Sequence, residues 1–415
     1  MQYRSTARLG VVALLLFALL APTLAQPRGQ RFNSFRTKHY EVMTDLNPAS
    51  VRWIAQHMDA AHDAYVQRLP AFRVRDSKPV RMYLFSNQMT YVQELGAMGL
   101  DARNTGGVFF ATEGEAGLAT WVHGYDRIEM LHVLQHEGFH QFAHLRIGAN
   151  LPIWANEGLA EYFGLGILIG RRFEQGLAPA SRLSRVQQAI RAGLHFPFEE
   201  MLGMEHAQWN ARVSRGDRRA GVMYDQAWAM VHFLFHADNG RFARPFEEYL
   251  RLIVSGYDRQ RAFARAFQTD DAGAFEQAWR RFMLDLEPDP VSTATERVEF
   301  LSEGLRRLHT TRRPAPESIE QLRDELRRVR FTLERFDHGV PRTLDSADDT
   351  LFEPPEVPPP DPRARRRPPP PTIELTPPAS DDIPPGVIVK GLRIEIELKW
   401  SLEGGVLPVA EIHHR

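Results

Sequence analysis

The stretch H-E-G-F-H at residues 136–140 decides how this chain is interpreted, because it places two histidines four positions apart. On an α-helix of 3.6 residues per turn, the side chains of His136 and His140 leave the same face, one above the other. Two imidazole nitrogens in that arrangement can share one tetrahedral zinc ion. Glu137 points about 100° away around the helix axis, so it reaches the open side of the metal and can take a proton from zinc-bound water.

A second motif follows at short range and can complete the zinc site. The sequence W-A-N-E-G at residues 154–158 lies in a helix predicted over residues 152–163, and its Glu157 can supply the third ligand. The alternative is a buried helix whose two histidines only form hydrogen bonds in the core. Zinc is favoured by the predicted helix, by the carboxylate helix that follows it and by signs of export.

The N-terminus has the pattern of an export signal. Arg4 and Arg8 precede an apolar run over residues 9–20, and Ala25 ends a small-residue cleavage pattern. The run is shorter than the roughly 20 apolar residues of a transmembrane helix, with an uncleaved anchor as the alternative. We therefore predict a signal peptide over residues 1–25, a periplasmic or secreted protein, and no stable membrane span after removal of the signal.

The composition limits the chemistry that the chain can perform. The chain has 415 residues, 43% of them hydrophobic, and a formal net charge of −1, so it can bury a core but predicts no nucleic-acid partner. It contains no cysteine, which excludes thiolate catalysis and cysteine–zinc sites. Any metal must therefore be held by histidine and carboxylate side chains.

Hydrophobic periodicity predicts an α+β fold, with a small mixed sheet lobe before the H-E-x-x-H helix and a mainly helical lobe around and after it. Strands are predicted at residues 35–45, 80–85, 106–111, 117–122 and 387–400. Helices are predicted at residues 49–69, 87–96, 127–147, 152–163, 224–237 and 317–336. The predicted units are an N-terminal α/β lobe (26–126), a helical zinc-site lobe (127–290), a helical extension (291–350), a Pro-rich linker (351–386) and a C-terminal β segment (387–415).

The two motifs together resemble those of the gluzincin metallopeptidases, which include thermolysin and the aminopeptidase N-like enzymes. The resemblance rests on residues 136–140 and 154–163, extends over residues 127–237, and looks closest to exported bacterial peptidase-MA-like proteins. It implies a thermolysin-like zincin core and a Zn²⁺-dependent peptidase in which Glu157 is the third zinc ligand. Glu157 lies 17 positions after His140, a slightly shorter gap than in the aminopeptidases.

Glu161 follows Glu157 by one helical turn, so it is an alternative third ligand. Ligating histidines usually donate their second ring N–H to a carboxylate or carbonyl, and in related enzymes an acidic residue at this position accepts it. We therefore expect Glu157 to bind zinc and Glu161 to orient a ligand histidine. The simpler alternative for Glu161 is an exposed charge on a helix.

Tyr224 begins an apolar helix, as the oxyanion-binding tyrosine does in aminopeptidase-like members. A phenol donates a hydrogen bond without carrying charge, which suits a developing oxyanion. A half-buried tyrosine at a helix start is an equal alternative. His132 and His144 extend the i, i+4 ladder of histidines, but a ladder roughly 18 Å long cannot bind one zinc ion. We expect these two to be neighbours of the site, and give His123 little weight.

The strand predicted at residues 106–111 limits the substrate. Aminopeptidase-type gluzincins carry a glutamate there that binds the free amine, whereas residues 106–110 read G-G-V-F-F. We predict an endopeptidase rather than an aminopeptidase, acting on peptide or protein substrates, which could pair with this strand. The alternatives are an envelope binding or scaffold protein that retains the gluzincin fold, with a partner for its Pro-rich tail, and a zinc hydrolase of non-peptide amides.

Overall fold

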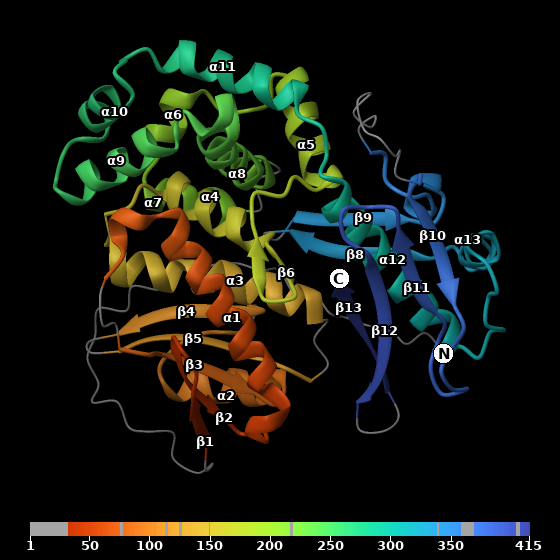
Figure 1. The fold of residues 1–415 in the computed structure, drawn as a ribbon. Coiled ribbons are helices and arrows are strands. Elements are labelled where there is room, and N and C mark those ends of the chain that lie inside the picture. The colour runs from red at the N-terminus through yellow and green to blue at the C-terminus, as the bar shows by residue number, and fades with distance from the viewer. Residues whose placement is uncertain are drawn as a thin grey trace.

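The protein combines a mixed five-stranded sheet, a helical region and a C-terminal antiparallel four-stranded sheet, an α+β architecture as predicted (Figure 1). The computed structural model describes residues 32–74, 78–103, 105–112, 115–123, 127–148, 150–215, 219–337, 340–357, 369–403 and 407–415. The predicted signal peptide lies outside these ranges. Within them, no helix has the length and apolar character to cross a membrane.

The five-stranded sheet has the order β1-β2-β3-β5-β4, which leaves β4 at an edge. Its strands are β1 (Asn33–Arg36), β2 (Tyr40–Thr44), β3 (Val80–Phe85), β4 (Gly107–Thr112) and β5 (Glu115–Trp121). The central pairs β2–β3 and β3–β5 are parallel, whereas β1 and β4 pair antiparallel with their neighbours. The single strand predicted over residues 35–45 is thus two strands, joined by a short turn.

Helices α1 (Pro48–Arg68) and α2 (Gln88–Ala97) connect these strands, and each begins at an asparagine cap. The Asn47 side chain accepts from the Ala49 N–H, and the Asn87 side chain accepts from the Thr90 N–H. Such caps satisfy helix N–H groups that have no partner within the helix. The two helices lie within a few residues of the boundaries that the sequence predicts.

Two interior helices carry both sequence motifs. Helix α3 (Arg127–Phe142) continues into one π-helical turn (Ala143–Ile147), and α4 (Ile153–Gly164) follows it. Every residue of α4 is buried, as is every residue of α3 from Val133 onward. A helix that is buried all round lies in the protein interior, so its polar side chains require partners there. Helix α3 packs on β4 and β5 as well as on α1 and α4.

The helical region continues from α4 to α12, interrupted by one short hairpin. Its helices are α5 (Ala180–Arg191), α6 (Phe198–Gly203), α7 (His206–Ser214), α8 (Ala220–His236), α9 (Ala243–Val254), α10 (Arg259–Phe267), α11 (Ala272–Asp285) and α12 (Pro290–Thr310). The hairpin of β6 (Ile167–Ile169) and β7 (Arg172–Glu174) was not predicted. Its strands have too few residues for the alternation of polar and apolar side chains to be recognised in the sequence. Gly170, with φ of +58°, lies in the turn between them.

The last part of the chain differs most from the predictions. The helix predicted over residues 317–336 is wrong beyond residue 328, because α13 (Ile319–Arg328) ends before Arg330 adopts a φ of +50°. Strands β8 (Thr332–Asp337) and β9 (Val340–Asp345) follow, inside the predicted helical extension. The expected linker over residues 351–386 contains β10 (Thr372–Thr376) between its prolines.

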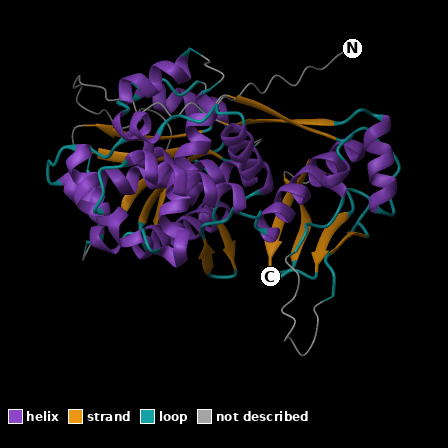
Figure 2. Ribbon diagram, turned by 90° about the horizontal axis from the view of Figure 1, so that it is seen from above, coloured by secondary structure: helices purple, strands orange, loops and turns teal. Residues whose placement is uncertain are grey.

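Strand β10 pairs with β11 (Gly386–Lys390) in a sheet that also contains β12 (Ile396–Glu403) and β13 (Leu407–His414). Its residues alternate in sequence between polar and apolar side chains, but two proline-rich segments flank them and obscure the pattern. The sheet packs on α12 through a second hydrophobic cluster. Figures 1 and 2 both show it beside the helical body, so the C-terminal β segment packs back on its own chain.

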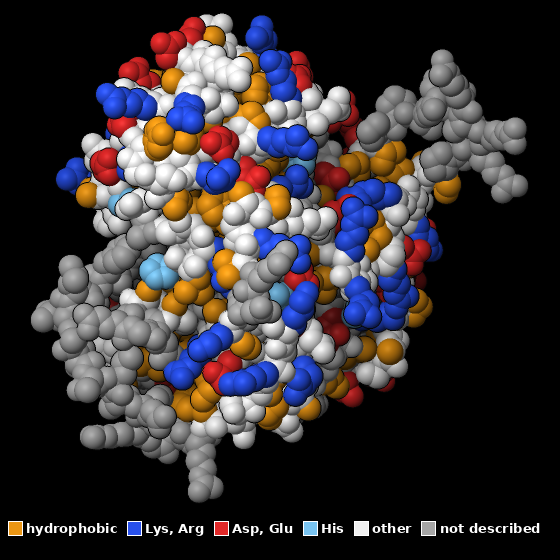
Figure 3. All heavy atoms as spheres, turned by 60° about the vertical axis from the view of Figure 1, so that its left-hand side comes forward, with side chains coloured by type: hydrophobic (Ala, Val, Ile, Leu, Met, Phe, Trp, Pro, Cys, Tyr) orange, Lys and Arg blue, Asp and Glu red, His pale blue; other side chains and the backbone are white. Residues whose placement is uncertain are grey.

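Ion pairs between distant parts of the sequence support this arrangement. Arg127, the first residue of α3, contacts Glu411 of β13 at 2.7 Å, and Arg393 contacts Glu174 of β7 at 2.5 Å. On the face of the molecule shown in Figure 3, basic, acidic and apolar side chains are interspersed.

Candidate metal centre

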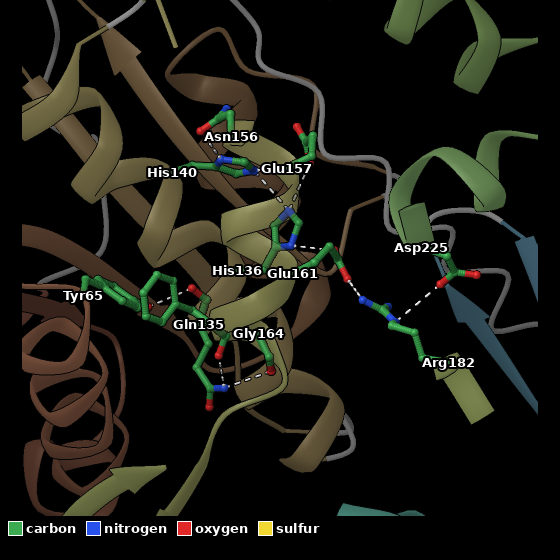
Figure 4. Close-up of polar contacts among 11 residues, drawn as sticks. Tyr65, Gln135, His136, His140, Asn156, Glu157, Glu161, Gly164, Arg182 and Asp225 are labelled. Carbon is green, nitrogen blue, oxygen red and sulfur yellow. Dashed lines mark hydrogen bonds and ion pairs between the residues drawn. The ribbon is translucent and has the colours of Figure 1, made fainter. Parts of the chain in front are cut away.

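The two histidines of H-E-x-x-H and the glutamate of N-E-G converge on one point. Nε2 of His136 lies 3.0 Å from Nε2 of His140, and the Glu157 Oε2 atom lies 3.5 and 3.7 Å from these two nitrogens. All three side chains are buried, and Figure 4 shows them beside one another. Three ligands bound tetrahedrally to zinc at roughly 2.0–2.1 Å stand about 3.4 Å apart, close to these separations. The group can therefore hold a metal ion.

The polar chemistry of this group also fits a cation. The Glu157 Oε2 atom is buried and has no hydrogen-bond partner among the described residues. Burial would raise the pKa of Glu157, but His140 and His136 lower it to about 2, so the carboxylate is ionised. Burial lowers the pKa of His136, but the carboxylates of Glu157 and Glu161 outweigh it and raise the pKa well above its usual value. The lowered pKa of Glu157 and the raised pKa of His136 both show that this group stabilises positive charge, which a divalent ion would provide.

Each histidine is oriented through its second ring nitrogen. Nδ1 of His136 lies 2.8 Å from a Glu161 carboxylate oxygen, and Nδ1 of His140 lies 3.2 Å from Oδ1 of Asn156. Such contacts fix the tautomer that leaves Nε2 free for a metal. Glu161 is buried, so the alternative of an exposed helix charge is wrong. Its contact with Nδ1 is the one that the expected orienting role requires, and that role stays a prediction.

Glu137 connects the metal group to the sheet edge. Its Oε2 atom accepts a hydrogen bond of 2.8 Å from the backbone N–H of Phe109 in β4. Its Oε1 atom is buried and has no hydrogen-bond partner in the described part of the chain. One oxygen is thus held by the edge strand, and the other is available as a proton acceptor.

Tyr224 lies in the second turn of α8 and is fully buried rather than half-buried. Its ring stands edge-on to Trp209 of α7, with ring centroids 5.0 Å apart. Burial raises the pKa of the Tyr224 phenol well above 10, and the charge of Glu157 raises it further. The phenol therefore stays protonated and can donate a hydrogen bond.

The other candidate histidines lie outside the metal group. His144 packs near the Phe109 ring, with ring centroids 5.4 Å apart, and His132 is partly exposed on α3. His123 is exposed beyond the end of β5.

A second histidine–carboxylate group, formed by His39, His62 and Asp63, is a poorer metal site. The two rings stack with centroids 4.0 Å apart and planes 23° apart, so the planes that contain their nitrogen lone pairs run nearly parallel instead of meeting at one metal position. Lys38 contacts both oxygens of Asp63, at 2.7 and 2.6 Å.

Gln135, next to His136, fixes α3 against the end of α4. Its Nε2 donates to the carbonyl oxygens of Gly164 and Gly166 at 2.9 and 3.0 Å, and its Oε1 lies 2.7 Å from Nε2 of His57 in α1. This buried glutamine, labelled in Figure 4, thus links the helix that carries both histidines to the end of the helix that carries Glu157.

Sequence reasoning missed an ion-pair network behind Glu161. Arg182 of α5 contacts Glu161 and also Asp225 of α8, and Arg185 binds Asp225 with two contacts of 2.7 Å. One sequence signal was present, because Arg182 lies four positions before Val186 and thus on the apolar face of α5.

The part of the chain that carries these residues matches a known family model. Residues 131–251 match the family described as "Protein of unknown function (DUF1570)". The matched stretch runs from α3 into α9 and contains the three metal-group residues together with Glu161, Arg182 and Tyr224. The comparison with curated proteins finds no match.

Proposed function

We propose that the protein is a zinc-dependent metallopeptidase of the gluzincin type. The observation that carries this proposal is the convergence of His136, His140 and Glu157 in a buried site, where one carboxylate oxygen of the neighbouring Glu137 has no hydrogen-bond partner among the described residues. Zinc held by these three side chains would polarise the scissile carbonyl and lower the pKa of a water molecule. The N-terminal export pattern further leads us to propose that the protein acts in the periplasm or outside the cell.

The roles that we assign to the chain's own residues follow from their contacts. Glu137 takes the proton of the attacking water and delivers it to the leaving amine. The Phe109 N–H holds the carboxylate of Glu137 in place, because it donates a hydrogen bond of 2.8 Å to the Oε2 atom. Tyr224, protonated and buried, donates a hydrogen bond to the oxyanion.

Strand β4 supports a peptide as the substrate. It pairs with β5 alone within the described sheet, so the backbone groups of its other edge lie outside the sheet ladder, and a peptide would reach them only by local opening because residues 107–110 are buried. The Phe109 N–H points to Glu137 rather than to β5, which places this edge beside the proposed general base. Gly107–Thr112 contains no carboxylate that could bind a terminal amine, so we propose an endopeptidase.

The test combines metal analysis with a substrate screen on the purified full-length protein. We expect one zinc per chain and cleavage of a mixed peptide library that stops after chelation and returns with Zn²⁺. Glu137→Gln should retain the zinc and lose at least 100-fold in turnover. A protein without stoichiometric metal, or a Glu137→Gln variant as active as the wild type, would contradict the proposal. Zinc without peptide cleavage would favour a scaffold, or a hydrolase of other amides if model amides in the same screen are cleaved.

A further inference from the structure

Arg182 occupies a position that is unfavourable for an arginine unless it serves the neighbouring site. It is only 5% exposed and lies in the first turn of α5, where the helix dipole disfavours a cation. Two buried carboxylates, those of Glu161 and Asp225, offset this cost. Arg185, one turn further along and partly exposed, contacts both oxygens of the Asp225 carboxylate at 2.7 Å.

The contacts of Glu161 divide its two oxygens between two partners. Oε1 contacts Nδ1 of His136 at 2.8 Å, and Oε2 accepts from the Arg182 guanidinium (Figure 4). A carboxylate held at both oxygens cannot rotate. The His136 ring is thereby fixed with Nε2 toward Glu157, and Glu161 is kept from turning to the metal itself.

We infer that Arg182 is a positioning residue of the metal centre, which fixes Glu161 behind His136 and so leaves Glu157 as the carboxylate ligand. The inference rests on the proposed zinc site. Glu157 and Glu161 both lie within reach of His136, so either carboxylate could be the third ligand. The contact of Arg182 with Glu161 would decide this choice in favour of Glu157.

Charge supports this role. The centre and its surroundings contain four carboxylates, those of Glu137, Glu157, Glu161 and Asp225, and two guanidinium groups, those of Arg182 and Arg185. At their formal charges, these six groups of the described chain sum to −2, which a divalent ion would neutralise. Loss of the Arg182 charge would leave an additional buried negative charge beside His136, with Glu161 free to rotate.

The test measures zinc affinity and ligand geometry in Arg182→Gln and Arg182→Lys. Competition with a chromophoric chelator should show Zn²⁺ binding 10- to 100-fold weaker in Arg182→Gln. Arg182→Lys should show a smaller loss, because an ammonium group restores the charge but not the fork that spans two carboxylates. The visible spectrum of the Co²⁺ form should change in Arg182→Gln, a readout that destabilisation alone would not alter. Arg191→Gln, an exposed change in the last turn of α5, is the matched control and should match the wild type.

The outcomes separate this inference from the proposed function. If the wild type binds no stoichiometric zinc, the proposed function fails. If the wild type binds zinc tightly and both Arg182 variants bind it within twofold, with the wild-type Co²⁺ spectrum, the positioning role of Arg182 is refuted while the zinc centre stands. Should Arg182→Gln not fold, Arg182→Lys decides alone, since an unchanged affinity and spectrum would refute the inference.

Discussion

Gly158, directly after the ligand Glu157, lies where α4 comes closest to α8, and its replacement by alanine should disturb both stability and metal binding. A Cβ atom at this position would stand 2.4 Å from the carbonyl oxygen of Ala227 and 2.8 Å from its carbonyl carbon. Ordinary contact begins at 3.4 Å, so the two helices would have to separate by about 1 Å. Because the obstacle is backbone, the overpacking cost should be near the upper end of the usual range, about 3 kcal/mol. The higher helix propensity of alanine offsets about 1 kcal/mol of this.

We therefore expect Gly158→Ala to lower the free energy of unfolding by about 2 kcal/mol. Urea unfolding followed by tryptophan fluorescence, with chelator present, measures this without a metal contribution. Gly96→Ala in α2 is the matched control, since nothing lies within 4 Å of its Cβ. Gly138→Ala, whose Cβ would meet the flexible end of Met58 at 2.6 Å and the Tyr65 hydroxyl at 3.2 Å rather than backbone, should fall between them. If Gly158→Ala were as stable as Gly96→Ala, the close contact of α4 with α8 would be refuted.

Two further predictions concern catalysis and pH. Tyr224→Phe should lower turnover roughly 100-fold and leave zinc affinity within twofold, and an unchanged kcat would remove Tyr224 from the mechanism. Burial lowers the pKa of His232 to about 3 and that of His236 to about 4, below the ordinary 6.5 that both regain on unfolding. Because the unfolded chain then binds more protons, stability should fall below pH 6.5, by about 1.4 kcal/mol per pH unit for each histidine, until these folded-state pKa values are reached. Urea midpoints between pH 7.5 and 4.5 check this, and the double variant with glutamine at both positions should show a shallower slope.

The parts of the fold that sequence predicts well are those with long and uninterrupted patterns. Helices α3 and α4 lie within a few residues of their predicted ends, and β4 lies within one residue of the strand predicted over residues 106–111. The proximity of His140 and Glu157, predicted from two short motifs, is present in the structure as a group that can hold a metal. Local spacing sufficed here because both ligand helices are adjacent in the chain.

Contacts between elements that are distant in the sequence could not be predicted from local sequence patterns. Arg182 and Asp225 meet from α5 and α8, 43 positions apart, and no period within either helix encodes that meeting. The hydrogen bond that holds Glu137 comes from the backbone N–H of Phe109, so no side-chain motif could predict this contact. Strand β10 was hidden for a compositional reason, because five residues of alternation are too few against the prolines around them.

The burial of all three metal-group side chains has a kinetic consequence. His136, His140 and Glu157 are each no more than 5% exposed, on two helices that the protein surrounds. Substrate, chelator and ion would all reach this site through a local opening of the elements that surround it, so the rate of metal exchange would report that opening rather than the strength of the bonds to the metal. Chelators should consequently inactivate the protein over a long and temperature-dependent time course. An ion captured as the chain folds would then be kept for much of the protein's lifetime, and the metal available at that moment would decide which ion the centre carries.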